Sequence, residues 1–132
     1  MEGLTKLENA VLEMLVDGKA ETFQILRGQY LAARVVKRHM TGVGFWTYFS
    51  IPDEVASLPG NPSFRFGDVD GNIDGLQNGA GFLLQVKDGY IYMLEGYSFD
   101  EPWPEDTNTF QLYYEGGLQR DEGEVIKSFS PG

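Results

Sequence analysis

The sequence contains no cysteine and only one histidine among its 132 residues. Without thiols there is no disulfide framework, no thiolate metal site and no cysteine nucleophile, which suits a reducing compartment. A single histidine, His39, excludes a multi-histidine metal site, and no G-x-S-x-G nucleophile elbow accompanies it. We therefore expect no resident metal and no cofactor, and we expect His39 to be an ordinary strand residue rather than a catalytic base.

Basic residues are also scarce, because ten Lys and Arg stand against twenty Asp and Glu, for a formal net charge of −10. Residues 1–40 are near neutral, so the negative charge lies mainly in the remainder of the chain. A strongly anionic surface repels phosphate backbones and acidic lipid headgroups. The composition thus disfavours nucleic acid and membrane surfaces as partners.

Long apolar runs are missing as well. No stretch approaches the ~20 apolar residues that span a bilayer. Charged residues interrupt the N-terminal "MEGLTKLENAVLEMLVDGK" every few positions, unlike the apolar run of a signal peptide. We expect a cytoplasmic protein, and its length predicts one domain over residues 1–132.

The N-terminal part carries the period and the end signals of two helices. Thr5 and Glu8 have capping-box spacing, and apolar residues recur on one helical face after them. Asp17 and Gly18 then supply a stop signal, and a second apolar period begins two residues later. We predict a helical hairpin over residues 5–33.

From residue 34 to about residue 115, β-branched and aromatic residues replace the helix formers. Two β-rich runs surround Asp88-Gly89, a dipeptide typical of a two-residue hairpin turn, and "TFQLYYE" alternates like a further strand. Helices followed by strands predict an α+β fold, with the hairpin of helices packed on a mostly antiparallel sheet of five to six strands. Residues 116–132 show weak periodicity and are expected to form a tail that is ordered only by docking.

The segment "DGNIDG" fits the opening of a calcium-binding loop. Asp70, Asn72 and Asp74 offer oxygen atoms at alternate positions. The match then fails, because the twelfth position is Gly81 instead of a bidentate Glu. We interpret the segment as a glycine-rich polar loop and not as a metal site.

Glu95 stands in the otherwise apolar strand "YIYMLEGY". Partial burial there would suit acid–base chemistry, and a hydrolase would then pair Glu95 with Asp68 or Asp100. The alternative is that Glu95 lies on the solvent face of the sheet or pairs with Arg34 or Arg38.

The segment "LEGYSFDEPWPED" combines carboxylates, aromatic residues and two prolines without a basic residue. The prolines restrict the backbone on both sides of the tryptophan between them. In one interpretation the aromatic residues cover a sheet edge as a lid and the carboxylates face water. In the other, an aromatic residue among carboxylates binds a cationic partner. The candidate binding residues are Tyr97, Phe99, Asp100, Glu101, Trp103, Glu105 and Asp106.

Three blocks between residues 41 and 104 carry a resemblance: "TGVGFWTYFSIP", "FRFGDVDGNIDGLQNGAGFLLQVKDG" and "LEGYSFDEPWP". With them the chain resembles a group of small uncharacterised bacterial proteins that have similar Gly-Val-Gly-Phe, Phe-Gly-Asp-Val, Gly-Ala-Gly-Phe and Glu-Gly-Tyr blocks. The resemblance implies a bacterial cytosolic α+β protein. It transfers no activity and no catalytic residue.

Between Gly67 and Asp106, nine carboxylates meet a single basic residue, Lys87. Because catalytic motifs are also missing, the sequence favours a non-enzymatic binding protein, immunity or inhibitor-like, whose acidic surface meets a basic protein. A hydrolase with paired carboxylates remains an alternative. A structural homodimer built on an exposed aromatic sheet face is another, so the sequence is compatible with both a monomer and a homodimer.

Overall fold

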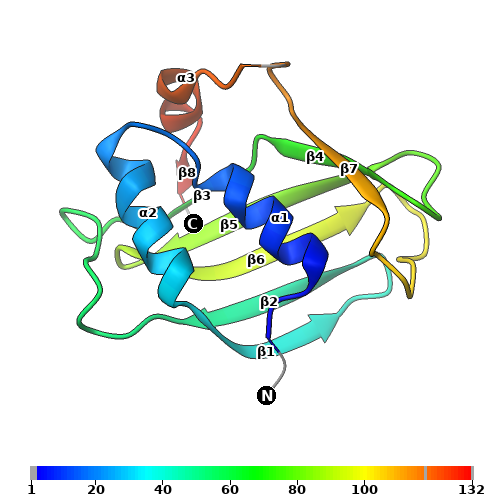
Figure 1. Ribbon diagram of the computed structural model, residues 1–132, viewed down its shortest axis with the longest axis horizontal. Coiled ribbons are helices and arrows are strands. Elements are labelled where there is room, and N and C mark those ends of the chain that lie inside the picture. The colour runs from blue at the N-terminus through cyan, green and yellow to red at the C-terminus, as the bar shows by residue number, and fades with distance from the viewer. Residues whose placement is uncertain (1–2, 118, 132) are drawn as a thin grey trace.

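The computed structural model describes residues 3–117 and 119–131 and shows a helical hairpin packed on an antiparallel sheet (Figure 1). The helices are α1 (Lys6–Leu15), α2 (Glu21–Ala32) and α3 (Glu122–Lys127). The strands are β1 (Arg34–Met40), β2 (Gly44–Ser50), β3 (Phe64–Phe66), β4 (Val69–Ile73), β5 (Ala80–Lys87), β6 (Tyr90–Ser98), β7 (Phe110–Tyr114) and β8 (Ser130–Pro131). The predicted α+β class is thereby confirmed. No helix in the described ranges is long and apolar enough to cross a membrane.

α1 begins at the predicted capping box. Thr5 Oγ1 accepts a hydrogen bond from the Glu8 N–H at 3.0 Å, and Glu8 Oε1 accepts one from the Thr5 N–H at 2.9 Å. The reciprocal bonds satisfy two backbone donors that the first helical turn leaves free. The apolar residues that α1 buries are Leu7, Val11, Leu12 and Leu15.

α2 holds the hairpin turn between β5 and β6 through one buried polar residue, Gln29. Gln29 Nε2 donates to the Gly89 carbonyl at 2.8 Å, and its Oε1 accepts from the Ile91 N–H at 2.8 Å. Asp88 and Gly89 have positive φ angles of 51° and 85°. Two successive positive φ angles are typical of the two-residue turn that the sequence predicts, and this prediction is confirmed.

The sheet is branched, with the main order β1-β2-β6-β5-β3-β8. The outer edge of β5 is shared by two strands, because β3 pairs with its residues 84–86 whereas β4 pairs with Ala80 and Gly81. β7 then pairs with β4. The sheet has eight strands instead of the expected five to six, since the chain divides into β3 and β4 and the C-terminal segment adds β8.

The expectation that "DGNIDG" forms a polar loop is wrong. Most of it lies in β4, where Val69, Gly71 and Ile73 are buried and alternate with more exposed residues. The alternation of buried and exposed side chains that marks a strand was hard to see in the sequence. The central buried residue is a glycine, and the residues on the exposed side are Asp70 and Asn72, which are typical of loops. An extended strand spaces these side chains along one face instead of wrapping them around an ion.

The C-terminal segment is docked onto the helical hairpin by Arg120, whose side chain is 6% exposed. Its guanidinium makes two hydrogen bonds to the Asp68 carboxylate, at 2.8 and 2.9 Å, and donates to the Leu15 carbonyl at 2.8 Å. It also lies over the rings of Phe23 and Tyr114, at 4.3 and 5.2 Å from their centroids. Arg120 thus places a cation at the C-terminal end of α1, where free carbonyls carry partial negative charge.

Glu122 and Phe129 complete this docking. Ala20, the N-cap of α2, has no side-chain cap of its own, and its N–H donates to Glu122 Oε1 at 2.8 Å. Phe129 stacks on Phe64 with ring centroids 4.1 Å apart, next to the pairing of β8 with β3. The segment expected to be a tail therefore forms a helix and a strand, and long-range contacts hold both.

α1 and α2 lie on one face of the sheet (Figure 1). The hydrophobic core lies between the two helices and the sheet. Phe45 and Phe49 of β2 are buried in this core. Trp46 and Tyr48 point to the other face of β2, which we call the open face because it lies away from α1 and α2. The aromatic residues on both faces of β2 are thus divided between the core and the open face.

Candidate binding surface

The loop after β6, residues 99–106, is braced by its own polar groups. Ser98 Oγ donates to the Glu101 carbonyl at 2.5 Å, and Asp100 between them has a positive φ of 63°. The Glu101 carboxylate accepts hydrogen bonds from the N–H groups of Gln77 and Asn78, at 2.8 and 2.9 Å. Glu101 therefore fastens the loop to the turn that follows β4.

Trp103 anchors the middle of the loop on the turn between β1 and β2. Its backbone N–H donates to the Gly42 carbonyl at 2.9 Å. Its half-buried ring meets Phe45 edge to face, with centroids 5.6 Å apart. The lid interpretation fits Trp103, which packs on the core, but it does not fit Phe99, whose side chain is 52% exposed.

Phe99 stands on this braced loop beside Tyr97. The two rings meet edge to face at a centroid distance of 5.8 Å. The Tyr97 ring lies over Gly81, where a Cβ atom would come within 2.5 Å of Tyr97 Cζ, so only glycine leaves room for it. Burial raises the pKa of the Tyr97 phenol, and the nearby carboxylates of Asp70 and Glu115 raise it further. Tyr97 is thus a neutral support for Phe99.

The remaining carboxylates of the loop face solvent. Asp100, Glu105 and Asp106 are exposed, and Asp106 Oδ1 also accepts from the Asn108 N–H at 2.9 Å. Exposed Val43 adjoins the loop, because its carbonyl accepts from the Ser98 N–H at 2.8 Å. We define the acidic–aromatic surface as Val43, Phe99, Asp100, Glu105 and Asp106.

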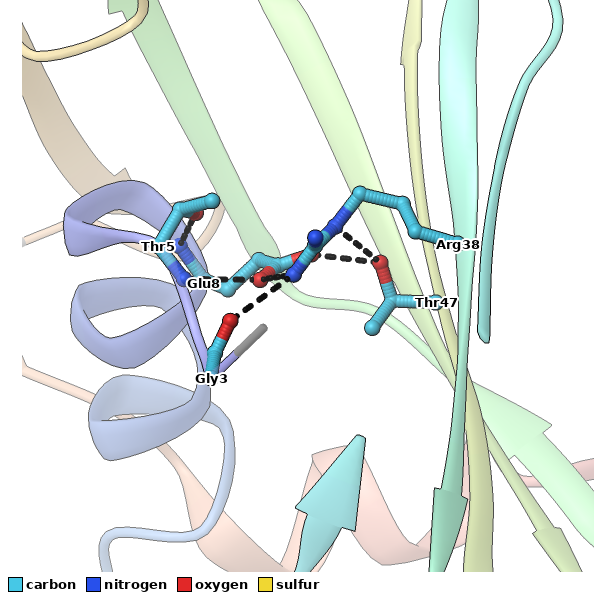
Figure 2. A network of polar contacts seen from close by, with 5 residues as sticks. All are labelled: Gly3, Thr5, Glu8, Arg38 and Thr47. Carbon is cyan, nitrogen blue, oxygen red and sulfur yellow. Dashed lines mark hydrogen bonds and ion pairs between the residues drawn. The ribbon is translucent and has the colours of Figure 1, made fainter. Parts of the chain in front are cut away.

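Figure 2 shows a network of polar contacts that joins Glu8, Arg38 and Thr47, and two of these residues, Glu8 and Arg38, line a pocket next to the loop. Arg38 Nη2 donates to Glu8 Oε1 at 2.6 Å and to the Gly3 carbonyl at 3.2 Å, while Arg38 Nε donates to Glu8 Oε2 at 2.9 Å. Thr47 Oγ1 also donates to the same carboxylate. The network joins α1 to β1 and β2.

Glu8 is only 1% exposed, yet it is held as a carboxylate. Burial alone would raise the pKa of Glu8, but hydrogen bonds from Arg38, from Thr47 and from the Thr5 backbone lower it below the ordinary value. A buried charge persists when its partners satisfy its lone pairs in this way. Glu8 and Arg38 line a pocket of about 230 Å³ together with Trp103 and Glu105. The network therefore forms one wall of a pocket whose other wall is the loop.

Sequence analysis missed the Glu8–Arg38–Thr47 network because of an irregularity in β1. Val35 faces Phe49 in the core, and strict alternation would turn Arg38 toward the open face. The register shifts between Val35 and Lys37, so Arg38 instead pairs with Thr47 on the core side. One signal was present: Glu8 occupies the apolar stripe of α1.

A second group of carboxylates lies on the open face, where Asp70 and Glu115 are close enough to shift each other's pKa. Burial raises the pKa of Asp70, and the charge of Asp68 adds to the effect. Burial also raises the pKa of Glu115, as does the charge of Asp70. A carboxyl group beside a second carboxylate holds its proton more tightly than it would alone.

The carboxylates that a hydrolase was expected to pair, Glu95 with Asp68 or Asp100, lie on different elements of the fold. Asp68 is engaged with Arg120, and Asp100 lies on the loop. Glu95 occupies the open face, at register positions opposite Trp46 and Leu83. Glu95 therefore lies on the solvent side of the sheet, where it is partly buried, as the alternative prediction had it. Arg38, one of its two expected partners, points to the core instead.

His39 also lies on the open face. Its ring is 5.2 Å from that of Trp46, the residue opposite it in β2. This contact places the imidazole against an aromatic ring on the exposed side of the sheet.

Comparisons with protein families, with curated proteins and with solved structures found no match to this chain. The geometry of the chain itself is therefore what indicates a function. The acidic–aromatic surface combines exposed apolar area, exposed charge and a braced backbone.

Proposed function

We propose that this protein binds a basic segment of a partner protein in the cytoplasm through the acidic–aromatic surface, as an immunity or inhibitor-like protein would. The observation that carries the proposal is Phe99, a large aromatic side chain that is half exposed among the carboxylates of a braced loop. Covering a phenyl side chain gains about 1.5–3 kcal/mol relative to leaving it in water. A partner that covers Phe99 would supply this gain.

The braced backbone supports a binding role. A loop that must become ordered on binding loses affinity to conformational entropy, and a loop already held in place does not. Glu101 and Trp103 tie this loop to two different turns of the sheet. Phe99 is therefore presented in a fixed position, as the central anchor of an interface is.

The charge distribution supports a basic partner. Asp100, Glu105 and Asp106 are exposed on the same loop as Phe99, and the whole chain carries a formal charge of −10. Carboxylates around an apolar centre steer a cationic partner and repel an anionic one. Two basic residues lie close to this loop and both are engaged, because Arg38 is paired with Glu8 and Lys6 Nζ donates to the Asn108 carbonyl at 3.2 Å.

Affinity capture from native cytosol, followed by titration of the captured proteins against purified variants, tests this proposal. We expect a captured basic protein to lose at least tenfold in affinity with Phe99→Ala. The control is Leu31→Ala, which removes a 68% exposed apolar side chain from α2 and should leave the affinity unchanged.

The charge arm of the test uses Asp100→Asn, Glu105→Gln and Asp106→Asn together. This variant should weaken binding most at low salt, where screening is least. A matched control, Asp53→Asn and Glu54→Gln with Glu124→Gln, neutralises three exposed carboxylates outside the surface. Equal affinities of the two charge variants, or an unchanged affinity of Phe99→Ala, would contradict the proposal.

The second candidate is a hydrolase, which the proximity of the Asp70 and Glu115 carboxyl groups favours. Two neighbouring carboxyl groups that share one proton can act as acid and base on a water that attacks an amide bond, as in aspartic proteases. Cleavage of a peptide panel that is lost in Asp70→Asn, and retained in Phe99→Ala, would support this function over the first.

A further inference from the structure

A pocket of about 560 Å³ lies between α2, the loop of residues 58–63 and the C-terminal segment. Pockets for small molecules measure roughly 300–1,000 Å³ and have mostly apolar walls with a few polar groups. The apolar walls of this pocket include Ile25, Leu58, Phe64, Ile126 and Phe129. It shares no residue with the acidic–aromatic surface.

The walls of the pocket are held in place by hydrogen bonds and by a ring contact. The Leu58 N–H donates to the Gly89 carbonyl at 3.0 Å, and the Gly89 N–H donates to the Pro62 carbonyl at 2.8 Å, so the loop is tied to the β5–β6 turn. Phe129 is stacked on Phe64. α3 is held through Arg120 and its neighbour Glu122. The pocket is therefore preformed, and a ligand would not have to order it.

The charge at the pocket limits the ligand. Glu21, in the first turn of α2, is the one ionisable side chain among the described residues that line it. The backbone N–H of Ala20 at the same helix end is already bound by Glu122, whose own charge is offset by Arg120 and Lys19, so Glu21 is the charge that a ligand in the pocket meets. An anionic ligand would meet repulsion there, whereas an amine would meet a partner for its charge.

We propose that this pocket binds a small molecule with an apolar body and a single cationic amine. The apolar body lies against Ile25, Ile126 and Phe129, and the amine lies at the rim beside Glu21. Burial of the apolar body supplies most of the affinity, because an exposed ion pair adds little.

Methyl-selective NMR titration tests the proposal, because the chain has five isoleucines and two of them, Ile25 and Ile126, line the pocket. Ile51, Ile73 and Ile91 serve as internal controls. The probes are 4-phenylbutylamine, 4-phenylbutanol and 4-phenylbutyrate, which share the apolar body and differ in charge. We expect saturable shifts confined to Ile25 and Ile126, with the amine binding tightest and the carboxylate weakest.

Two variants separate the apolar part of the proposal from the charged part. Thr22→Phe, which fills the pocket from α2, should abolish the shifts of the Ile25 and Ile126 methyl groups. Glu21→Gln should weaken the amine about fivefold and leave the alcohol unchanged. The control Glu124→Gln removes the same charge from an exposed site outside the pocket and should change neither.

The proposal is overturned if none of the three probes gives saturable shifts at Ile25 and Ile126, or if all five isoleucines shift alike. Equal affinity of the amine and the carboxylate would overturn the assignment of a cationic ligand. Because the acidic–aromatic surface is untouched by these variants, the outcome is independent of partner binding.

Discussion

At the scale of single residues, the Glu8–Arg38 pair shows how a buried charge is kept in this protein. A buried ion pair adds little net stability, since desolvation offsets most of its attraction. The pair instead contributes specificity, because the two hydrogen bonds from Arg38 to Glu8 fix the position of α1 relative to β1. They also fix one wall of the pocket next to the loop of residues 99–106. Thr47 completes the carboxylate's partners from β2.

Removal of one partner should therefore be far more costly than removal of both. Arg38→Met leaves the Glu8 carboxylate buried without its cation, and we expect the free energy of unfolding to fall by about 3–5 kcal/mol. The double variant Glu8→Met with Arg38→Met should recover most of this loss, because no unpaired charge remains. Urea unfolding of the two variants measures the difference, and equal losses in both would refute the account.

At the scale of elements, α3 and β8 depend on Arg120 for their position. Arg120→Ala would leave Asp68 half-buried without its cation and would remove the group that lies over Phe23 and Tyr114. We expect a loss of about 3 kcal/mol. Hydrogen exchange at the Val125 and Ser128 amides, which both donate within α3, should accelerate more than exchange in β5 and β6.

Lys127→Ala is the control for this prediction. Lys127 pairs with Glu124 on the solvent side of the same helix, with both side chains largely exposed, and such pairs contribute little. If Lys127→Ala accelerated exchange in α3 as much as Arg120→Ala, docking through Arg120 would not be what orders the segment.

The elements that the sequence predicted correctly are those with local signals. The capping box of Thr5 and Glu8 and the turn at Asp88-Gly89 are set by residues adjacent in the chain, so spacing and residue type suffice to find them. The α+β class follows from the order of these elements.

The elements that it did not predict depend on partners far away in the chain. β8 has only two residues, and α3 has six, so neither carries a usable period. Their order comes from Arg120 and Phe129, which meet residues more than 50 positions earlier. The candidate surface shows the same dependence on distant partners. The sequence showed that the loop is rich in carboxylates and aromatic residues. It could not show that Glu101 binds the turn at Gln77 and Asn78 while Asp100 faces solvent.

At the scale of the whole molecule, the excess of carboxylates makes stability depend on pH in two opposite ways. The pKa of Glu8 is lowered, so its contribution to stability is present above the ordinary value and is lost as the pH falls through the folded-state pKa. The pKa values of Asp70 and Glu115 are raised, chiefly by burial. Their contribution is present below the ordinary values, roughly 4, and is lost as the pH rises through the folded-state values.

Asp70→Asn should consequently reduce the dependence of Tm on pH in the range above pH ~4. In the wild-type protein, the native state binds more protons than the unfolded state just above pH ~4, so Tm should fall as the pH rises through the mildly acidic range. The variant removes one carboxylate of the pair and relieves Glu115 of the charge of its neighbour. Asp53→Asn is the matched control, because it changes the net charge equally from an exposed position. Thermal melts between pH 4 and 8 should show a smaller fall for Asp70→Asn than for Asp53→Asn; parallel profiles would mean that general repulsion among the carboxylates, and not the Asp70–Glu115 pair, sets the pH dependence.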